Sequence, residues 1–197
     1  MTPTSGAQGP EEPGLSPADR EAVARVRELA GRGYIGPERA RAIVAVAPEA
    51  RDRVLEWLGG FARAGDWRSF EKFANLAVDT HPEGLAAVVA PVVAGGTAGV
   101  NHEDLVEILG EAAAGDADPA AVAALHSLLV ARLPAAAPPY ALLLKIVHAL
   151  GAIGGGRAEE ILRSVAVGEH PKPLKWEAAV ELGIEDDLGF DEDEMTR

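Results

Sequence analysis

Residues 147–183 read VHALGAIGGGRAEEILRSVAVGEHPKPLKWEAAVELG, and HALG at 148–151 is echoed by VELG at 180–183, 32 residues later. The stretch holds three segments with the apolar spacing of helices, separated by glycines and by a proline-containing turn. Leu-Gly pairs recur upstream at 58–59 and 109–110. The successive spacings of 51, 41 and 32 residues are not a fixed period, but the shorter two match one helix pair with its turns. The echo therefore predicts a repeated pair of helices.

The same pattern of helices extends upstream along most of the chain. Ser16 and Asn101 are predicted N-caps, Asp118-Pro119 is predicted to start a helix, and proline opens several other helices. We expect Pro91 to kink or end the apolar segment 85–93. The apolar run at 43–47 could form a strand, but the preceding residues PERARA at 37–42 favour a helix. About ten helices of 10–16 residues follow from this pattern, so the fold is predicted to be all-α.

Composition divides the chain into three parts. Residues 1–15 are rich in proline, glycine, serine and threonine and are expected to form a disordered tail. Residues 16–184 are expected to form one helical-repeat domain, in which the nearly all-apolar helix 140–153 is buried on several sides. Residues 185–197 are predicted to be an acidic tail.

Three segments of the stretch resemble HEAT repeats, and especially their short bacterial relatives. They are ALGAIG at 149–154, RAEEIL at 157–162 and WEAAVELG at 176–183. The usual aspartate of the first turn is replaced by glycine, and the arginine of the second helix is out of register. The resemblance implies stacked helical hairpins that form a small α-solenoid. A closed helical bundle is the alternative fold.

The composition narrows the class of protein. Apolar residues make up 48% of the chain and aromatic residues 5%, which favours closely packed Ala- and Leu-rich helices. There is no cysteine, so disulfides and thiol catalysis are excluded. No apolar run is long enough to span a membrane, and the start of the sequence lacks the features of a secretory signal. We expect a cytoplasmic protein.

Negative charge is concentrated in the second half of the sequence. The net charge is −13, of which residues 101–197 carry −11, from 18 acidic and 7 basic residues. Nucleic acid is an unfavourable partner for such a surface. The charge indicates either a solvated surface that keeps the protein soluble or a surface that binds a basic partner.

No chemistry-bearing motif stands out. Histidines 81, 102, 126, 148 and 170 are evenly spaced, but none has a carboxylate or a second histidine at a familiar ligand spacing. His126 and His148 are predicted to be satisfied histidines near the apolar core, and His81 and His170 to lie in loops. Neighbouring acidic residues point in different directions on a helix and are read as solvated. We therefore predict no catalytic residues, no cofactor and no metal ligands.

Aromatic and acidic side chains are the candidates for partner binding. Trp57 is among the aromatic residues expected to be exposed, and the ten arginines between 20 and 68 are expected to pair along their own helices, as in Glu21–Arg25, Glu38–Arg41 and Glu49–Arg53. Tryptophan and tyrosine often anchor interfaces. The predicted partner-binding residues are Trp67, Trp176, Tyr34, Glu185, Asp186 and Asp187.

The favoured function is non-enzymatic. A helical-repeat protein of this kind is expected to bind another protein, preferably a basic one, as an adaptor, a scaffold or an immunity-type protein. One alternative is a HEAT-like enzyme, or enzyme accessory, that acts on nucleic acid. The other is a homo-oligomeric structural component, for which the apolar segment 85–93 is the expected contact. The sequence does not fix the oligomeric state.

Overall fold

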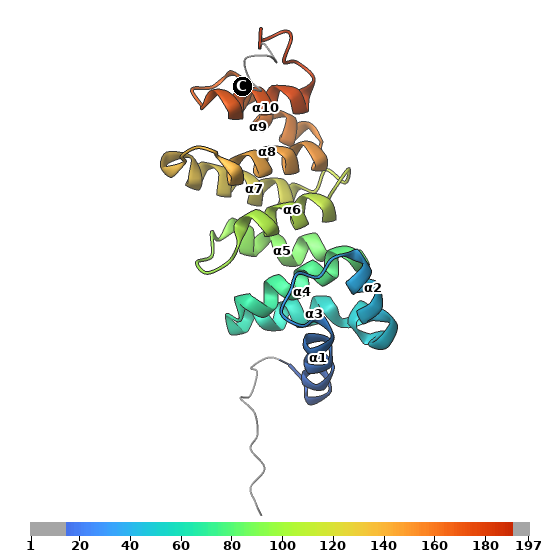
Figure 1. Cartoon of the computed structure of the whole chain (residues 1–197). Helices are drawn as coiled ribbons and strands as arrows, with labels where there is room; N and C mark the ends of the chain where they lie inside the picture. Colours follow the sequence, from blue (N-terminus) through green and yellow to red (C-terminus); the bar gives the residue numbers. More distant parts are fainter. Residues whose placement is uncertain (1–14, 191–197) are drawn as a thin grey trace, which may run out of the picture.

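The computed structural model describes residues 15–190, and in this part of the chain the regular secondary structure is all helix, without a β-strand. The predicted all-α class is therefore confirmed. Figure 1 shows the helices stacked one after another, with the first and the last at opposite ends. They are α1 (Pro17–Ala30), α2 (Pro37–Val46), α3 (Glu49–Ala64), α4 (Trp67–Thr80), α5 (Leu85–Ala94), α6 (His102–Ala112), α7 (Pro119–Arg132), the short 3₁₀ helix η1 (Leu133–Ala135), α8 (Ala141–Ile153), α9 (Gly156–Val167) and α10 (Lys172–Leu182).

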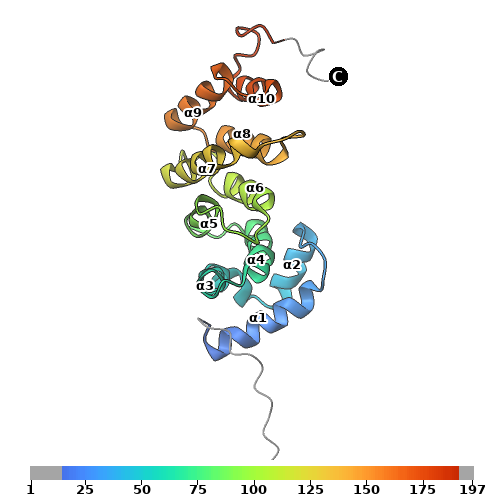
Figure 2. The same cartoon turned by 90° about the vertical axis from the view of Figure 1, so that its left-hand side faces the viewer.

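The helices form two rows. Every extensive contact joins helices that are one or two places apart in the chain. One side of the stack is the even-numbered row, formed by α2, α4, α6, α8 and α10 in that order (Figure 2). The other side is the odd-numbered row, formed by α3, α5, α7 and α9. A single buried apolar cluster runs between the rows from α1 to α10. Neighbouring helix pairs thus share one continuous core, because no pair alone could bury its apolar face.

Local sequence determines where the helices begin. The side chain of Ser16 accepts a hydrogen bond from the Asp19 amide, Asn101 accepts one from Glu103, and Asp118 accepts one from Ala120. Each cap satisfies an amide that lacks a helical partner. The predicted caps Ser16 and Asn101 and the predicted helix start at Asp118-Pro119 are therefore confirmed, and the 43–47 run, apart from its last residue, belongs to helix α2 as favoured.

Pro91 does not end helix α5, one of the two outcomes expected there, because the helix continues to Ala94. Pro91 and Ala87 are both exposed, so the backbone carbonyl that lacks a helical donor lies toward water. The apolar residues of segment 85–93 are mostly buried against α3, α6 and α7 rather than exposed. Only Ala87 and Pro91 of this segment are exposed, so it offers little apolar surface for self-association.

A buried aspartate connects α1 to α3. Asp19 is 5% exposed and accepts hydrogen bonds from Ser16, from Trp57 Nε1 at 2.8 Å and from Arg53 Nη2 at 3.1 Å. Burial alone would raise the pKa of Asp19, but these hydrogen bonds and the Arg53 charge together lower it. Trp57 is fully buried and packs edge-on against Phe73 at 5.8 Å, so its predicted exposure is wrong.

The arginines of the first helices mostly reach other helices. Glu21 and Arg25 form the predicted pair at 3.8 Å, but Arg25 also contacts Glu49 at 3.0 Å. Arg53 pairs with Asp19 and Glu56 rather than with Glu49. The Arg41 side chain donates to the Pro37 carbonyl, not to Glu38. Of the three predicted pairs, only Glu21–Arg25 forms, because Arg53 contacts the buried Asp19 of α1 and Arg41 donates to a carbonyl of its own helix.

The chain after α10 packs back onto the core. Residues 184–190 form turns, in which the Phe190 amide donates to the Glu185 carbonyl at 3.1 Å. Ile184 and Phe190 contact the apolar cluster, as does Leu15 at the other end. Of the expected tails, 1–14 and 191–197 lie outside the described residues. No helix in the described range 15–190 is long and apolar enough to cross a membrane.

His102, at the start of α6, is expected to make the fold sensitive to mild acid. The residue is 8% exposed, and its Nε2 has no hydrogen-bond partner among the described residues. Burial, and then the Arg132 charge, lower the pKa of His102 from 6.5, outweighing a hydrogen bond with the Val100 backbone. The unfolded chain then takes up a proton near pH 6.5 that the folded chain resists, so stability falls as the pH drops below that value.

We expect His102→Gln to remove part of this acid sensitivity. Between about pH 7.5 and 5.5, the wild type should lose more of its free energy of unfolding than the variant does. Urea unfolding at both pH values measures the difference. His81→Gln, at an exposed position, is the control and should behave like the wild type. An equal loss in wild type and His102→Gln would contradict the prediction.

Candidate functional site

A shallow groove lies on the outer side of the even-numbered row, where α6 and α8 pack together. Its volume is about 280 Å³. The floor is formed by small residues, Gly110, Ala149 and Ala152, and charged side chains surround it. The lining residues are Glu107, Gly110, Glu111, Lys145, His148, Ala149 and Ala152.

Glycine at position 110 accounts for the depth of the groove. A Cβ atom there would lie 2.8 Å from the Cβ of Ala149 and 3.0 Å from its Cα. No real side chain tolerates these distances, so α6 and α8 approach closely only because position 110 has no side chain. The close approach of the two helices leaves an apolar furrow, and the longer side chains of Glu107, Glu111, Lys145 and His148 project around it.

Negative charge dominates around the groove. We define the acidic face as Glu103, Glu107 and Glu111 of α6, Lys145 and His148 of α8, and Glu177 and Glu181 of α10. Lys145 lies 3.0 Å from Glu107 and 3.3 Å from Glu103. The hydrogen bond with Glu107, supported by Glu103, raises the pKa of Lys145 despite partial burial. Five carboxylates thus surround one lysine and one histidine, which leaves the face negatively charged.

His148 connects α8 to α10. Its Nδ1 lies 2.8 Å from Glu181 Oε1, and its Nε2 lies 3.4 Å from Glu177 Oε1. The His148 side chain is 53% exposed, so the predicted buried position near the core is wrong. The carboxylates come from residues 29 and 33 positions later, which is why no ligand spacing was visible around this histidine in the sequence.

The other end of the even-numbered row is different in charge. A pocket of about 240 Å³ lies between α4 and the loop before α2. Its charged lining residues are the cations Arg32, Arg68 and Lys72 and the carboxylates Glu71 and Asp104, and Tyr34 lines it as well. Lys72 donates a hydrogen bond to the Gly31 carbonyl. Burial first, and then the charges of Arg68, Arg39 and Arg27, lower the pKa of Lys72. Cations therefore slightly outnumber carboxylates in this pocket, whereas carboxylates dominate around the groove between α6 and α8.

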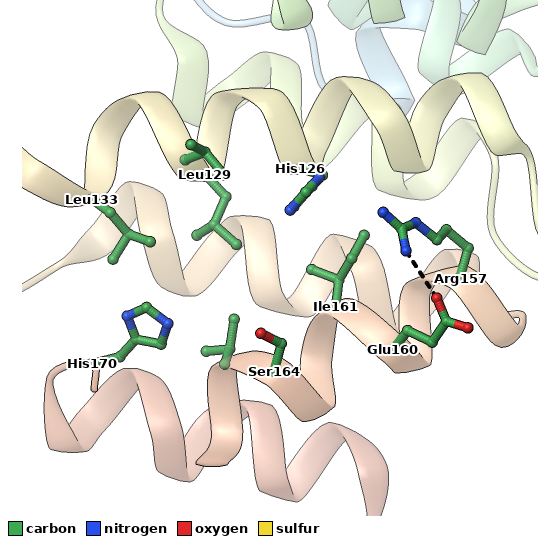
Figure 3. Close-up of a pocket in the computed structure, with 10 residues that line it drawn as sticks. His126, Leu129, Leu133, Arg157, Glu160, Ile161, Ser164 and His170 are labelled. Carbon is green, nitrogen blue, oxygen red and sulfur yellow. Dashed lines mark hydrogen bonds and ion pairs between the residues drawn. The ribbon is translucent and has the colours of Figure 1, made fainter. Parts of the chain in front are cut away.

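The odd-numbered row carries a second cavity, of about 250 Å³, between α7 and α9 (Figure 3). His126 points toward α9, and the half-buried His170 lies at the end of the cavity away from Arg157 and Glu160. Arg157 contacts Glu160 at 2.9 Å, so a carboxylate neutralises the cation at the rim. The floor is apolar, with Leu129 and Ile161. His126 thus lines a cavity rather than the core.

The residues predicted to bind a partner are distributed over two separate regions. Tyr34 is 71% exposed and lines the basic pocket, whereas Trp67 is half-buried and packs on Phe70 at 6.0 Å. Trp176 is half-buried on α10. The three acidic residues 185–187 follow that helix, and Asp186 and Asp187 are exposed whereas Glu185 is half-buried. The structure does not bring these six residues together, and none of them lines the groove.

The sequence interpretation missed the acidic face. Two signals were present: lone polar residues, Lys145 and His148, on a nearly all-apolar helix, and glutamates spaced four apart on neighbouring helices. Comparisons of this chain with protein-family models, with curated proteins and with solved structures gave no match. The function is therefore argued from the site itself.

Proposed function

We propose that this chain is a small HEAT-like α-solenoid that binds a basic segment of another protein along its acidic face. The observation that carries the proposal is the groove between α6 and α8, which combines an apolar floor with a carboxylate rim. Protein interfaces commonly place small apolar contacts at the centre and charged groups around them. The protein would act as an adaptor, a scaffold or an immunity-type protein rather than as an enzyme, and its expected location is the cytoplasm.

The charges of the face favour a cationic partner. Lys145 already occupies the space between Glu103 and Glu107, and Glu111 lies one turn further along α6. The five carboxylates of the acidic face outnumber Lys145 and His148, and this excess of negative charge around an apolar furrow attracts lysine or arginine side chains whose aliphatic stems cover the floor. An acidic or nucleic-acid ligand would meet repulsion here.

A photo-crosslinking experiment tests this assignment. The photoreactive residue p-benzoylphenylalanine replaces Ala152 in the groove or, as a matched control, the exposed Ala123 on α7. After irradiation in an extract of the source cells, we expect one protein to crosslink at position 152 but not at 123. Mass spectrometry should place the crosslink in a segment rich in lysine or arginine.

Raising the salt concentration and reversing the charge of glutamates test whether the binding is electrostatic. Crosslinking at position 152 should fall when salt rises from about 0.05 M to about 0.5 M, because the charges are exposed. The variant Glu107→Lys/Glu111→Lys should abolish it, whereas Glu159→Lys/Glu160→Lys on α9 should not. Equal crosslinking at 152 and 123, or nucleic acid retained by the basic pocket instead of a protein, would refute the proposal.

A further inference from the structure

His148, Glu177 and Glu181, at the α10 end of the acidic face, lie close enough together to suggest a second role. Each offers one ligand atom, and these atoms lie within 4.8 Å of one another. We call these three side chains the His148 cluster. The imidazole comes from α8 and both carboxylates come from α10, so the cluster bridges two helices that pack side by side.

The backbone is shaped to let the carboxylates converge. Glu177 and Glu181 are four residues apart on α10 and therefore lie on the same face of that helix. Gly151 lies three residues after His148, and a Cβ at position 151 would overlap the Glu181 carboxylate. Glu181 thus occupies space that any other residue at position 151 would fill.

The two glutamates are largely withdrawn from water. Their side chains are 17% and 24% exposed, compared with 53% for His148. Two carboxylates held close together in this way repel each other, and a single imidazolium can neutralise only one of them. A divalent cation would compensate both charges at once.

The donor set matches a transition metal. One imidazole nitrogen and two carboxylate oxygens are ligands that zinc takes in proteins, with bonds of about 2.0–2.2 Å. Such bonds place ligand atoms about 3.3 Å apart in a tetrahedral site. Glu181 contacts His148 Nδ1 at 2.8 Å and Glu177 contacts Nε2 at 3.4 Å, whereas an imidazole binds one ion through a single nitrogen. One carboxylate must therefore swing toward the nitrogen that binds the ion, and the three ligand atoms already lie within 4.8 Å of one another.

We propose that the His148 cluster binds one divalent transition-metal ion, for which Zn²⁺ is the probe. The ion would be held by His148, Glu177 and Glu181, and water or a side chain from another molecule would complete the coordination. It would connect α10 to α8 and thus fasten the last helix pair to the stack. His148 also lines the groove, so the ion would lie beside the acidic face.

Calorimetry on the full chain, without a histidine tag and freed of metal with a chelator, tests the proposal. Titration with Zn²⁺ should give one site per chain, with a Kd of about 1 µM or tighter. His148→Gln, Glu177→Gln and Glu181→Gln should each weaken binding about tenfold or more. The matched control, Glu107→Gln/Glu111→Gln, removes a glutamate pair of the same spacing on α6 and should leave the Kd within about twofold.

Gly151→Ala supplies a test of geometry with every ligand retained. The new methyl group displaces Glu181, so zinc affinity should fall although alanine is the better helix former. Co²⁺ in place of Zn²⁺ should produce the visible absorption of tetrahedral cobalt in the wild type, and this signal should be lost in His148→Gln. Far-UV circular dichroism of each variant checks that the helices remain intact.

Three results would overturn the proposal: no saturable zinc binding by the wild type, unchanged binding by His148→Gln, or an equal loss in the α6 control pair. The last result would indicate that zinc is attracted to acidic residues in general and is not bound at one site. None of these results concerns the crosslinking at Ala152, which is carried out in the presence of chelator. The metal site and the protein-binding face can therefore fail independently.

Discussion

Replacing Gly110 by leucine is expected to lower the free energy of unfolding by about 3 kcal/mol. Position 110 is buried, and even a methyl group there would lie 2.8 Å from the Cβ of Ala149. The obstacle includes the Ala149 backbone, which cannot rotate away as a flexible side chain could. Because α6 and α8 form the most extensive contact between helices of one row, their separation would disturb the core on both sides.

Urea unfolding followed by circular dichroism measures this effect. Gly110→Ala should lose less, about 1 kcal/mol, because the higher helix propensity of alanine offsets part of the overlap. Glu111→Leu introduces the same side chain at the exposed neighbouring position and should change stability by less than about 0.5 kcal/mol. If Gly110→Leu were as stable as this control, the close approach of α6 and α8 would be wrong.

Asp19→Ala should destabilise the protein by about 2–3 kcal/mol at neutral pH. The substitution leaves the buried Trp57 Nε1 without its acceptor at 2.8 Å and removes the carboxylate that holds Arg53 against α1. It also removes the acceptor of the Ser16 hydroxyl at the start of α1. A buried donor without an acceptor lowers the free energy of unfolding by more than an ordinary hydrogen bond adds to it. Asp52→Ala, at an exposed position on α3, is the control and should have little effect.

The Asp19 effect should depend on pH in a defined direction. The pKa of Asp19 is lowered from 3.8 in the folded protein, so its ionised form contributes stability above that value. This contribution is lost as the pH falls through the folded pKa. The difference between wild type and Asp19→Ala should therefore shrink below about pH 4. A difference that stays constant from pH 7 to strongly acidic pH would show that the ionised carboxylate is not what stabilises α1.

Features that depend on nearby residues were predictable from the sequence. The N-caps Ser16, Asn101 and Asp118 act on amides two or three residues away, so their roles require no knowledge of the tertiary structure. The all-α class follows from the same local patterns. Pro91 shows the limit of this reasoning, because packing and solvent exposure allow α5 to continue past a residue that disfavours helix.

Features that depend on the register between helices were not predictable. Trp57 was expected to be exposed because its burial requires an acceptor 38 residues away, at Asp19. The His148 cluster likewise depends on how far α10 slides along α8. The i, i+4 spacing of Glu177 and Glu181 was visible in the sequence, but their convergence on His148 was not. The acidic face as a whole follows from the stacking of α6, α8 and α10.

The contacts between near neighbours also govern how the chain reaches this structure. Since every extensive contact joins helices at most two places apart, folding closes only short loops. Proteins with such local contacts fold rapidly, and a stack can grow from any part that has formed. On the ribosome, α1 to α4 could form their shared core, around Trp57 and Phe73, before α10 has been synthesised. Each later helix would then add to a surface that is already in place.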